Sequence, residues 1–395
     1  MRICHVGSGF FPVPPLAGGG SERFLYNLAR EQAKLGHEVH VLDLSWPEMG
    51  FITQDDLVQF HRLAPFRPLK RGIFLEAYFN WHLLKAVRGV VRKNRINILH
   101  FHTPIPCITC SLLTRACGLK IAMVLTVHNP LLSEDHLTRR FATWKSRLIY
   151  FPAWIGAIRK ADSVVCLNSG MMEVATSIGR SHGRLFVVPT AADLERFYPQ
   201  PRVQKKTGSI LYVAVVNPFK NQEVIIRACA TIAQLVSEIL FVGAVSPGYG
   251  SYRKHLETLA NFLGLGQKVK FLGSVPNEDL PDLYNQSQIY IHASFGEGMS
   301  LAVLEALSCG SFVIASDIPS HRDFIRPMEN GLLFPPDDPT ALAKEIANTL
   351  NDTELFKRVS SNAPRFARQD ANWSAMCKRY MQIYEETMIG VKRKR

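Results

Sequence analysis

Short apolar runs that alternate with helical patterns constrain the fold of this chain more than any other feature of its sequence. In the first half we expect strands at residues 2–6, 39–42, 98–101, 122–126, 163–166 and 185–188. In the second half we expect strands at residues 210–216, 239–242, 269–272, 289–292 and 312–315. Strands that alternate with helices are typical of parallel sheets, in which a helix carries the chain back to the start of the next strand. The sequence therefore predicts the α/β class, with a doubly wound parallel sheet in each half.

Length and charge narrow the class of protein further. The chain has 395 residues, which is enough for two domains that each have a core. Its formal net charge of +13 predicts an anionic partner, whether a sugar nucleotide, an acidic membrane surface or a nucleic acid. The sequence contains no module typical of nucleic-acid binding, so we expect no nucleic acid. No apolar run is long enough for a membrane span, and the first residues lead directly into a strand, so we expect no signal peptide and a cytoplasmic location.

The cysteines predict buried thiols. The chain has eight, scattered in apolar contexts rather than spaced as a disulfide framework. Cys107 and Cys110 have the spacing of a metal-binding pair, and His100 and His102 precede them. A second pair is lacking, so we predict no metal site.

Residues 294–305, SFGEGMSLAVLE, predict a binding site at the end of a strand. They follow a short β-rich run and contain a glycine turn, after which apolar residues recur at helical spacing. At such a helix start the backbone N–H groups of Met299, Ser300 and Leu301 are expected to lack partners and to attract a phosphate.

Two carboxylates accompany these amides. Glu297 lies on the turn and Glu305 in the helix, so both can face the crevice at the end of the strand. Carboxylates accept hydrogen bonds from hydroxyl groups, and a site with amides for phosphate and acids for hydroxyls suits a sugar nucleotide. The alternative is that Glu297 caps the helix and Glu305 is a solvated surface acid.

The residues around the two glutamates resemble a known signature. The E-x7-E spacing is followed by an apolar helix, Gly310, a strand that ends near Asp317, and Asn330-Gly331. This run resembles the donor-site signature of the family 4 glycosyltransferases, which have the GT-B fold. The resemblance implies two Rossmann-like domains with a cleft between them and a C-terminal helix that crosses back. We therefore expect an acceptor-side domain at 1–195, a donor-nucleotide domain at 205–370, and the crossing helix with a basic tail at 371–395.

The same resemblance implies which residues of the second half bind the donor. Lys220 matches a family lysine that holds the diphosphate, whereas the family's preceding arginine falls on Val215. The loop at 272–276 resembles the segment that contacts the base, where the backbone of Val275 would read it. Thr190 and Ala191 stand where Asn-Gly is usual, and alanine would be strained at a positive φ, so we expect a different local backbone there.

In the first half, Gly18, Gly19 and Gly20 precede a helix expected at 22–35. The resemblance implies that this glycine loop closes over the donor diphosphate and lines the acceptor site. Gly7-Ser8-Gly9 suggests a dinucleotide fingerprint instead, but the third glycine is replaced by Pro12. We therefore do not favour a nicotinamide cofactor.

His128 follows an expected strand on the crevice side. An isolated histidine in such a place is usually structural, but the resemblance puts a histidine here next to the donor sugar. His100 and His102 resemble strand-end histidines of the same family, to which we assign a supporting role. Asn129 stands where those proteins often have aspartate.

Residues 67–95 are basic and rich in aromatic side chains. They fit an interfacial helix on an anionic membrane, supported by the basic terminus at 392–395. The alternative is an ordinary helix with Phe79, Leu83 and Val87 in the core.

Together these features predict a metal-independent, retaining glycosyltransferase without a cofactor. It would transfer a hexosyl unit from a UDP- or GDP-sugar to a hydroxyl of a glycan or lipid-linked acceptor, in cell-surface polysaccharide or glycolipid synthesis. Lys220 and the amides would stabilise the leaving diphosphate, Glu305 would bind the ribose, Glu297 the donor sugar, and His128 would orient that sugar. A sugar-nucleotide epimerase on the same fold and a catalytically impaired nucleotide-sugar-binding subunit remain as alternatives. A glycosidase also needs two carboxylates, but it needs no phosphate site.

Overall fold

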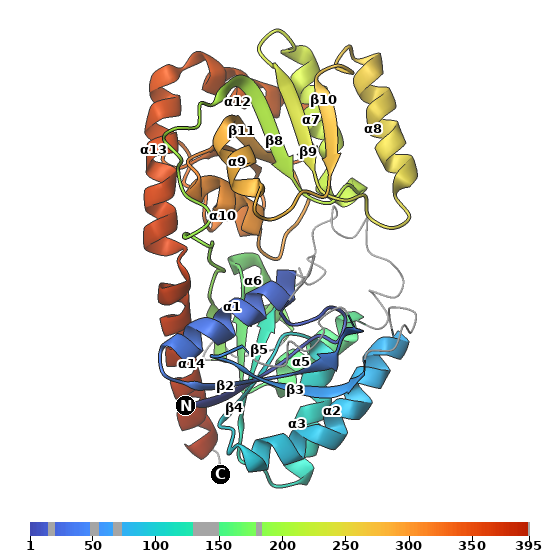
Figure 1. The fold of residues 1–395 in the computed structure, drawn as a ribbon, viewed down its shortest axis with the longest axis vertical. Coiled ribbons are helices and arrows are strands. Elements are labelled where there is room, and N and C mark those ends of the chain that lie inside the picture. The colour runs from blue at the N-terminus through green and yellow to red at the C-terminus, as the bar shows by residue number, and fades with distance from the viewer. Residues whose placement is uncertain (15–19, 48–54, 66–72, 129–149, 179–183, 394–395) are drawn as a thin grey trace. The chain divides into compact units, whose positions relative to one another are not determined.

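The computed structural model describes residues 1–14, 20–47, 55–65, 73–128, 150–178 and 184–393. These residues form two compact units (Figure 1). Of the described residues, unit 1 contains those up to Pro189 together with the C-terminal segment from Trp373 onward, and unit 2 contains Thr190–Asn372. Gly18, Gly19, Asn129, residues 67–72 and the last two residues of the basic terminus lie outside the described residues. Within the described part of the chain, no helix combines the length and the apolar character needed to cross a membrane.

Unit 1 is built on a seven-stranded parallel sheet in the order β3-β2-β1-β4-β5-β6-β7. Helices α1 and α14 pack on one face, and α2, α3 and α5 on the other (Figure 1). The strands are β1 (Arg2–Val6), β2 (Glu38–Ser45), β3 (Gln59–Pro65), β4 (Ile98–Phe101), β5 (Ala122–Val127), β6 (Ser163–Cys166) and β7 (Leu185–Val187). The helices are α1 (Gly20–Lys34), α2 (Ile73–Lys93), α3 (Pro104–Ala116), α5 (Phe151–Lys160), α6 (Ser169–Ser177) and α14 (Trp373–Arg393).

Unit 2 is built on a six-stranded parallel sheet in the order β10-β9-β8-β11-β12-β13. Apolar layers cover both of its faces, so neighbouring strand residues such as Ile210 and Leu211 are buried on opposite sides. The strands are β8 (Lys206–Val213), β9 (Glu238–Val242), β10 (Val269–Gly273), β11 (Ser287–His292), β12 (Phe312–Ser316) and β13 (Leu332–Phe334). The helices are η4 (Pro218–Lys220), α7 (Gln222–Thr231), α8 (Gly250–Phe262), α9 (Leu280–Gln286), α10 (Leu301–Ser308), α11 (Pro319–Arg322), α12 (Pro339–Asn351) and α13 (Thr353–Asp370).

The predicted doubly wound parallel sheets are confirmed in both units, with corrections to individual elements. Strands β3 and β13 are not predicted from the sequence, and α1 begins two residues before its predicted start. The strand predicted at 210–216 begins earlier, at Lys206, and ends at Val213. Val216 forms only an isolated bridge with Val245.

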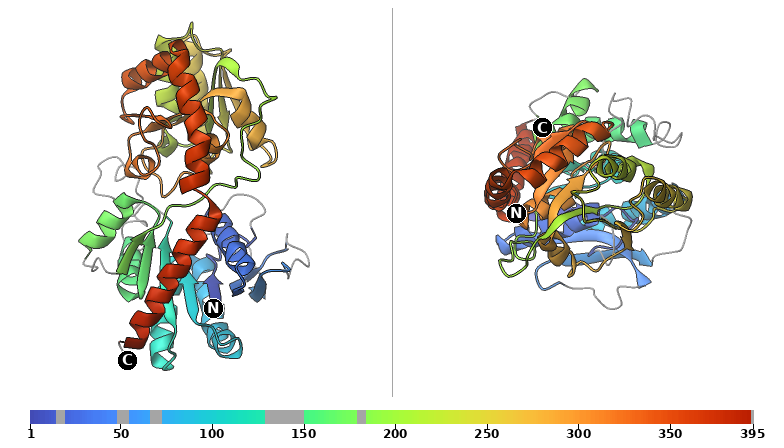
Figure 2. Two further views of the ribbon diagram at one scale, coloured as in Figure 1. Left: turned by 90° about the vertical axis from the view of Figure 1, so that its left-hand side faces the viewer. Right: turned by 90° about the horizontal axis from the view of Figure 1, so that it is seen from above.

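The C-terminal helix α14 belongs to unit 1, although the chain enters it directly from unit 2. It lies against α1 (Figure 2), and its apolar face is buried there through Tyr380, Ile383 and Tyr384. The helix therefore completes the core of unit 1 and also supplies two phenol groups to the interior of that unit.

Two expectations from the sequence are confirmed, one about the cysteines and one about the backbone at Thr190 and Ala191. All eight cysteines are free thiols, and Cys117 is the one that is not fully buried. Thr190 and Ala191 are both buried, and neither is among the described side-chain-bearing residues with positive φ, which are Arg95, Asn221 and Met328. The local backbone therefore avoids the conformation that would strain an alanine.

Candidate functional site

The strand order of unit 2 reverses between β8 and β11, which are neighbours in the sheet but not in the chain. In open α/β sheets, ligands bind at the carboxyl ends of the strands at such a switch point. Lys220 lies in the loop after β8, and Glu297 lies in the loop after β11. The Phe295 N–H donates to the Phe219 carbonyl at 3.1 Å and so ties the two loops together.

The sequence Asn217-Pro-Phe-Lys-Asn221 folds into a tight turn that positions Lys220. The Asn217 side chain accepts a hydrogen bond from the Lys220 N–H at 3.1 Å and so caps η4. Asn221 then adopts the left-handed region, with φ of 53°, which asparagine tolerates better than most residues. Its side-chain amide donates to the Pro336 carbonyl at 2.6 Å. These bonds fix the backbone of Lys220 in the connection that follows β8.

The Glu297 carboxylate collects three side-chain donors on a single oxygen, Oε1. The Lys220 ammonium lies 2.5 Å away, the Ser294 hydroxyl 2.6 Å and the His292 Nε2 atom 2.9 Å. The ion-paired side chains are 18% (Lys220) and 12% (Glu297) exposed, so the pair is largely desolvated but reachable from solvent. Glu297 therefore does not cap α10, whose N-cap is Ser300.

The surroundings keep Glu297 ionised. Burial alone would raise the pKa of this carboxyl group, but the Lys220 charge and the His292 hydrogen bond outweigh it and hold the pKa well below its usual range. Burial lowers the pKa of His292, so its ring is neutral and donates from Nε2 to Glu297. The other ring nitrogen, Nδ1, then accepts from the Tyr290 hydroxyl at 2.8 Å. His321 packs edge-on against His292, with ring centroids 5.2 Å apart, and burial lowers its pKa to about 3.

The start of α10 has the open backbone that the sequence predicts. Across the ranges that the structure describes, the N–H groups of Met299, Ser300 and Leu301 have no hydrogen-bond acceptor. Unpaired amides at a helix N-terminus carry partial positive charge and favour an anion, by about 0.3 to 1 kcal/mol at an exposed site. This part of unit 2 can therefore attract a phosphate.

Glu305 is not a surface acid. Its residue is 7% exposed, and its Oε2 accepts a hydrogen bond from the Tyr284 hydroxyl at 2.9 Å. Val275 packs against the same apolar layer as Tyr284. The structure thus supports an inward-facing role for Glu305.

Val215, where the resembling family has arginine, is 42% exposed.

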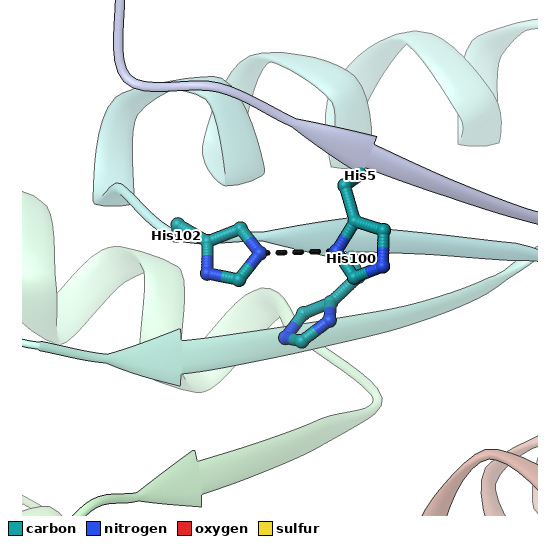
Figure 3. Close-up of side chains that lie close together, drawn as sticks. All are labelled: His5, His100 and His102. Carbon is teal, nitrogen blue, oxygen red and sulfur yellow. Dashed lines mark hydrogen bonds between the residues drawn. The ribbon is translucent and has the colours of Figure 1, made fainter. Parts of the chain in front are cut away.

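Unit 1 has its own switch point, between β1 and β4. His5 on β1 and His100 on β4 are register partners, and His102 directly follows β4. Figure 3 shows these three rings close together in the interior. The His5 Nδ1 and His102 Nε2 atoms lie 3.1 Å apart, and the His102 Nδ1 atom lies 2.9 Å from Nε2 of His128, which follows β5.

Burial keeps these histidines neutral. It lowers the pKa of His5 to about 4 and that of His128 to about 3, and it holds the pKa of His100 and His102 well below the usual value. His128 is therefore not an isolated structural histidine but the outermost member of a connected group.

His5, His100 and His102 could hold a metal ion, because one ring nitrogen from each lies within 4.8 Å of the others. Each of these rings, however, already uses both nitrogens in hydrogen bonds to protein groups. A metal ion would have to break several of these bonds. Cys107 and Cys110 belong to no metal-binding group among the described residues, and both are buried in α3.

The glycine loops of unit 1 are described in part. Gly20 opens α1, whereas Gly18 and Gly19 lie outside the described residues. Gly9 has φ of 74°, and a side chain at that position would clash with Phe79. Residues 7–14 follow β1 and form no helix, so this described part of the loop lacks the short strand-to-helix turn of a dinucleotide-binding fingerprint.

Several polar residues of these sites are not predicted from the sequence: His5, Gln32, Tyr284, His292 and Ser294. His292 ends the predicted strand before the E-x7-E segment, so its position at a strand terminus was a usable signal. Tyr284 and Gln32 resemble ordinary helix residues, and only the folded chain reveals their partners.

Comparison with known proteins agrees with this geometry. The family model "Glycosyl transferases group 1" matches residues 195–366, and "Glycosyltransferase Family 4" matches residues 18–196. A putative glycosyltransferase, EpsD of Bacillus subtilis, is 26% identical over 85% of this chain and 85% of its own length. A phosphatidylinositol N-acetylglucosaminyltransferase subunit from Schizosaccharomyces pombe is 24% identical over 95% of this chain and 78% of its own length.

Solved structures show the same fold. A sucrose-phosphate synthase from Thermosynechococcus elongatus matches with a TM-score of 0.82 and 21% identity, covering 98% of this chain and 99% of that chain. HepE from Anabaena, in complex with UDP and glucose, matches with a TM-score of 0.77 and 18% identity, covering 98% and 100%. Two Rossmann-like units with these matches define a glycosyltransferase of the GT-B type. The chain belongs to the family 4 glycosyltransferases.

Proposed function

We propose that this protein is a retaining, metal-independent glycosyltransferase that moves a hexosyl unit from a UDP- or GDP-sugar to a hydroxyl of its acceptor. The observation that carries the proposal is the Lys220–Glu297 pair beside the open start of α10. A nucleoside diphosphate sugar has both groups that such a site complements, an anionic diphosphate and neutral hydroxyls.

The ion pair suits a site that exchanges partners. Without a donor, each charge of the pair compensates the other in a largely desolvated place, where an unpaired charge would be costly. When the donor binds, its diphosphate takes Lys220 and the amides at 299–301, and Glu297 turns to the sugar hydroxyls. As the bond to the sugar breaks, charge develops on the departing diphosphate, and these preorganised donors stabilise it.

Glu305 is proposed to accept hydrogen bonds from the ribose hydroxyls, and the backbone at Val275 to contact the base. His128 is proposed to accept a hydrogen bond from the donor sugar. Gly18, Gly19 and Gly20 would approach the diphosphate through their backbone. No cofactor is required, because positioning and electrostatic stabilisation supply the catalysis.

The test is a screen of UDP- and GDP-sugars with candidate acceptors, run with the wild type and with Glu297→Ala. We expect transfer by the wild type, retained anomeric configuration in the product by NMR, unchanged rate in EDTA, and loss of transfer in the variant. Unchanged product formation by Glu297→Ala would remove that residue from the mechanism. A donor isomerised without acceptor would indicate the epimerase, and no turnover with any donor would indicate a binding subunit.

The acceptor is proposed to be a glycan or a lipid-linked molecule at the cytoplasmic face of a membrane. Helix α2 buries Phe79, Leu83 and Val87 in the core, yet it exposes Phe74 and Trp81. Basic side chains line the exposed part of the same helix, namely those of Lys85, Arg88 and Arg92. An apolar and basic surface of this kind favours anionic lipid. Sedimentation with vesicles that contain anionic lipid tests this, and binding that Phe74→Ser and Trp81→Ser do not weaken would contradict it.

A further inference from the structure

A continuous chain of hydrogen bonds runs through the interior of unit 1 and ends at His128. It starts at Gln32 on α1, whose side-chain oxygen lies 2.8 Å from the His5 Nε2 atom. It continues through the 3.1 Å contact between His5 and His102 and the 2.9 Å contact between His102 and His128. Gln32 and His5 are 0% exposed and His102 is 2% exposed, so water does not compete for these bonds.

The donor and the acceptor of each hydrogen bond in this series follow from the chemistry of Gln32. An amide oxygen only accepts, so His5 carries its proton on Nε2 and, being neutral, presents Nδ1 as an acceptor. His102 must then donate from Nε2 and accept at Nδ1. By the same rule His128 donates from Nε2, and its Nδ1 carries a free electron pair. In the described part of the chain, this nitrogen has no hydrogen-bond partner.

A second branch fixes the orientation of the Gln32 amide. Its nitrogen donates to the Tyr384 hydroxyl oxygen at 3.1 Å, and the Tyr384 hydroxyl lies 2.7 Å from the His100 Nδ1 atom. The His100 Nε2 atom in turn lies 2.7 Å from the Thr126 hydroxyl. Because the amide nitrogen of Gln32 donates to Tyr384, its amide oxygen is the atom that faces His5. The same branch connects the C-terminal helix α14 to the histidines. All of these groups are fully buried.

We propose that Gln32, His5 and His102 are positioning residues that hold His128 as the tautomer with its proton on Nε2, so that Nδ1 faces the donor sugar as a hydrogen-bond acceptor. The part played by the sugar rests on the function proposed above. The tautomer itself does not, since it follows from hydrogen bonds inside unit 1. A histidine with the opposite tautomer would present a donor at Nδ1 and would reject a hydroxyl proton that the first tautomer accepts.

The test is NMR of the full-length protein with 15N-labelled histidines, which distinguishes protonated from unprotonated ring nitrogens. We expect a proton on Nε2 in His5, His102 and His128. Gln32→Met removes the acceptor at nearly constant volume, and we expect mixed tautomers at His102 and His128, although within the described residues neither ring is hydrogen-bonded to Gln32. Leu28→Met, a buried change on the same helix, should leave all three rings as they are.

Gln32→Glu is the conservative variant that distinguishes a relay from packing. Burial without a counter-ion keeps the introduced carboxyl group protonated. Its carbonyl oxygen then accepts from His5 and its hydroxyl donates to Tyr384, as the amide does, so we expect His5, His100, His102 and His128 to keep their wild-type tautomers. Transfer assays should show a two- to tenfold lower kcat for Gln32→Met, little change in donor KM, and recovery in Gln32→Glu.

A wild-type His128 protonated on Nδ1 would overturn the proposal, as would changes in Gln32→Met that are confined to His5. One equivalent of a metal ion bound by His5, His100 and His102 in the purified protein would also overturn it. If the tautomers are as expected but His128→Ala leaves transfer unchanged, the relay stands and only the contact with the sugar is wrong. If no transfer is found with any donor, the proposed function fails while the NMR result still decides the relay.

Discussion

The two units fill equivalent places in their sheets with different chemistry. In unit 1 the switch point between β1 and β4 holds neutral histidines joined by hydrogen bonds. In unit 2 the switch point between β8 and β11 holds an ion pair, Lys220 and Glu297, next to unpaired helix amides. The same topology therefore offers neutral polar contacts in one unit and full charges in the other.

The difference assigns different ligand groups to the two units. A buried neutral network is rigid and suits the orientation of hydroxyl groups, because it needs no counter-ion and, within the described residues, each of its ring nitrogens except Nδ1 of His128 has a hydrogen-bond partner. A partly exposed ion pair can give up one partner to a charged ligand. We therefore expect unit 2 to control affinity for the diphosphate and unit 1 to control turnover of the sugar.

The largest effect is expected for Glu297→Gln. The change removes the charge from the carboxyl group that accepts three donors, and we expect kcat/KM to fall about 100-fold, or ~2.7 kcal/mol in the transition state. The measurement is steady-state transfer, with circular dichroism to confirm folding. Glu354→Gln, which neutralises a carboxylate on an 84% exposed side chain in the same unit, is the matched control and should be silent. Equal activities in the two variants would show that the charge of Glu297 does not contribute to transfer.

Acid should destabilise the protein through the buried histidines. Their folded-state pKa values lie below the unfolded value near 6.5, so below pH 6.5 the unfolded state binds protons that the folded state does not. Stability therefore falls as pH decreases from 6.5 toward 4, by up to about 1.4 kcal/mol per pH unit for each such histidine. Glu297, whose pKa is depressed, contributes stability above its unfolded pKa near 4.5, and that contribution is lost only at lower pH.

Urea unfolding at pH 7.5, 6.0 and 5.0 measures this dependence. We expect His128→Gln to reduce the slope between pH 6 and 5 by about 1.4 kcal/mol per unit, because one fewer histidine is protonated on unfolding. A slope identical to that of the wild type would show that His128 titrates normally in the folded protein.

His128→Ala should lower turnover without changing affinity for the nucleoside diphosphate, and so distinguish the contribution of unit 1 from that of unit 2. The variant would lose the proposed hydrogen bond to the sugar, and we expect kcat to fall about tenfold, or ~1.4 kcal/mol, with the Kd of the free nucleoside diphosphate unchanged. Titration calorimetry with UDP and GDP, alongside transfer assays, checks both halves of this statement. A large rise in Kd for the diphosphate would contradict the division of labour.

The smallest effect is expected for Val215→Arg, which restores the cation of the resembling family at a 42% exposed position. An added cation near the diphosphate should lower the donor KM by about fivefold, or ~1 kcal/mol. Phe262→Arg adds the same charge at an 84% exposed position at the end of α8 and serves as the control. Equal donor KM values in the two variants would show that Val215 does not face the phosphate.

The sequence predicts most of the sheets, because buried parallel strands are continuous apolar runs. It misses β3, an edge strand in which only Ala64 is classed as buried, and β13, which is only three residues long. An edge strand buries few side chains and so carries a weak pattern.

The site is predictable only where it is local. The E-x7-E segment and the helix start lie in one stretch of chain, and both were identified. The Lys220–Glu297 pair joins residues 77 positions apart, and the Gln32–Tyr384 bond joins residues 352 positions apart. Such pairs depend on strand order and on the return of α14 to unit 1, which no local pattern encodes.

Thermal and urea unfolding with UDP and GDP would decide whether unit 2 carries the charge that binds the diphosphate. We expect one nucleotide at about 100 times its Kd to stabilise the wild type and the control Lys206→Met, an exposed lysine of the same unit, by about 2.7 kcal/mol. Lys220→Met should lose most of that stabilisation at the same concentration, whereas His128→Ala should keep it. Equal stabilisation of Lys220→Met and the wild type would show that Lys220 does not bind the diphosphate.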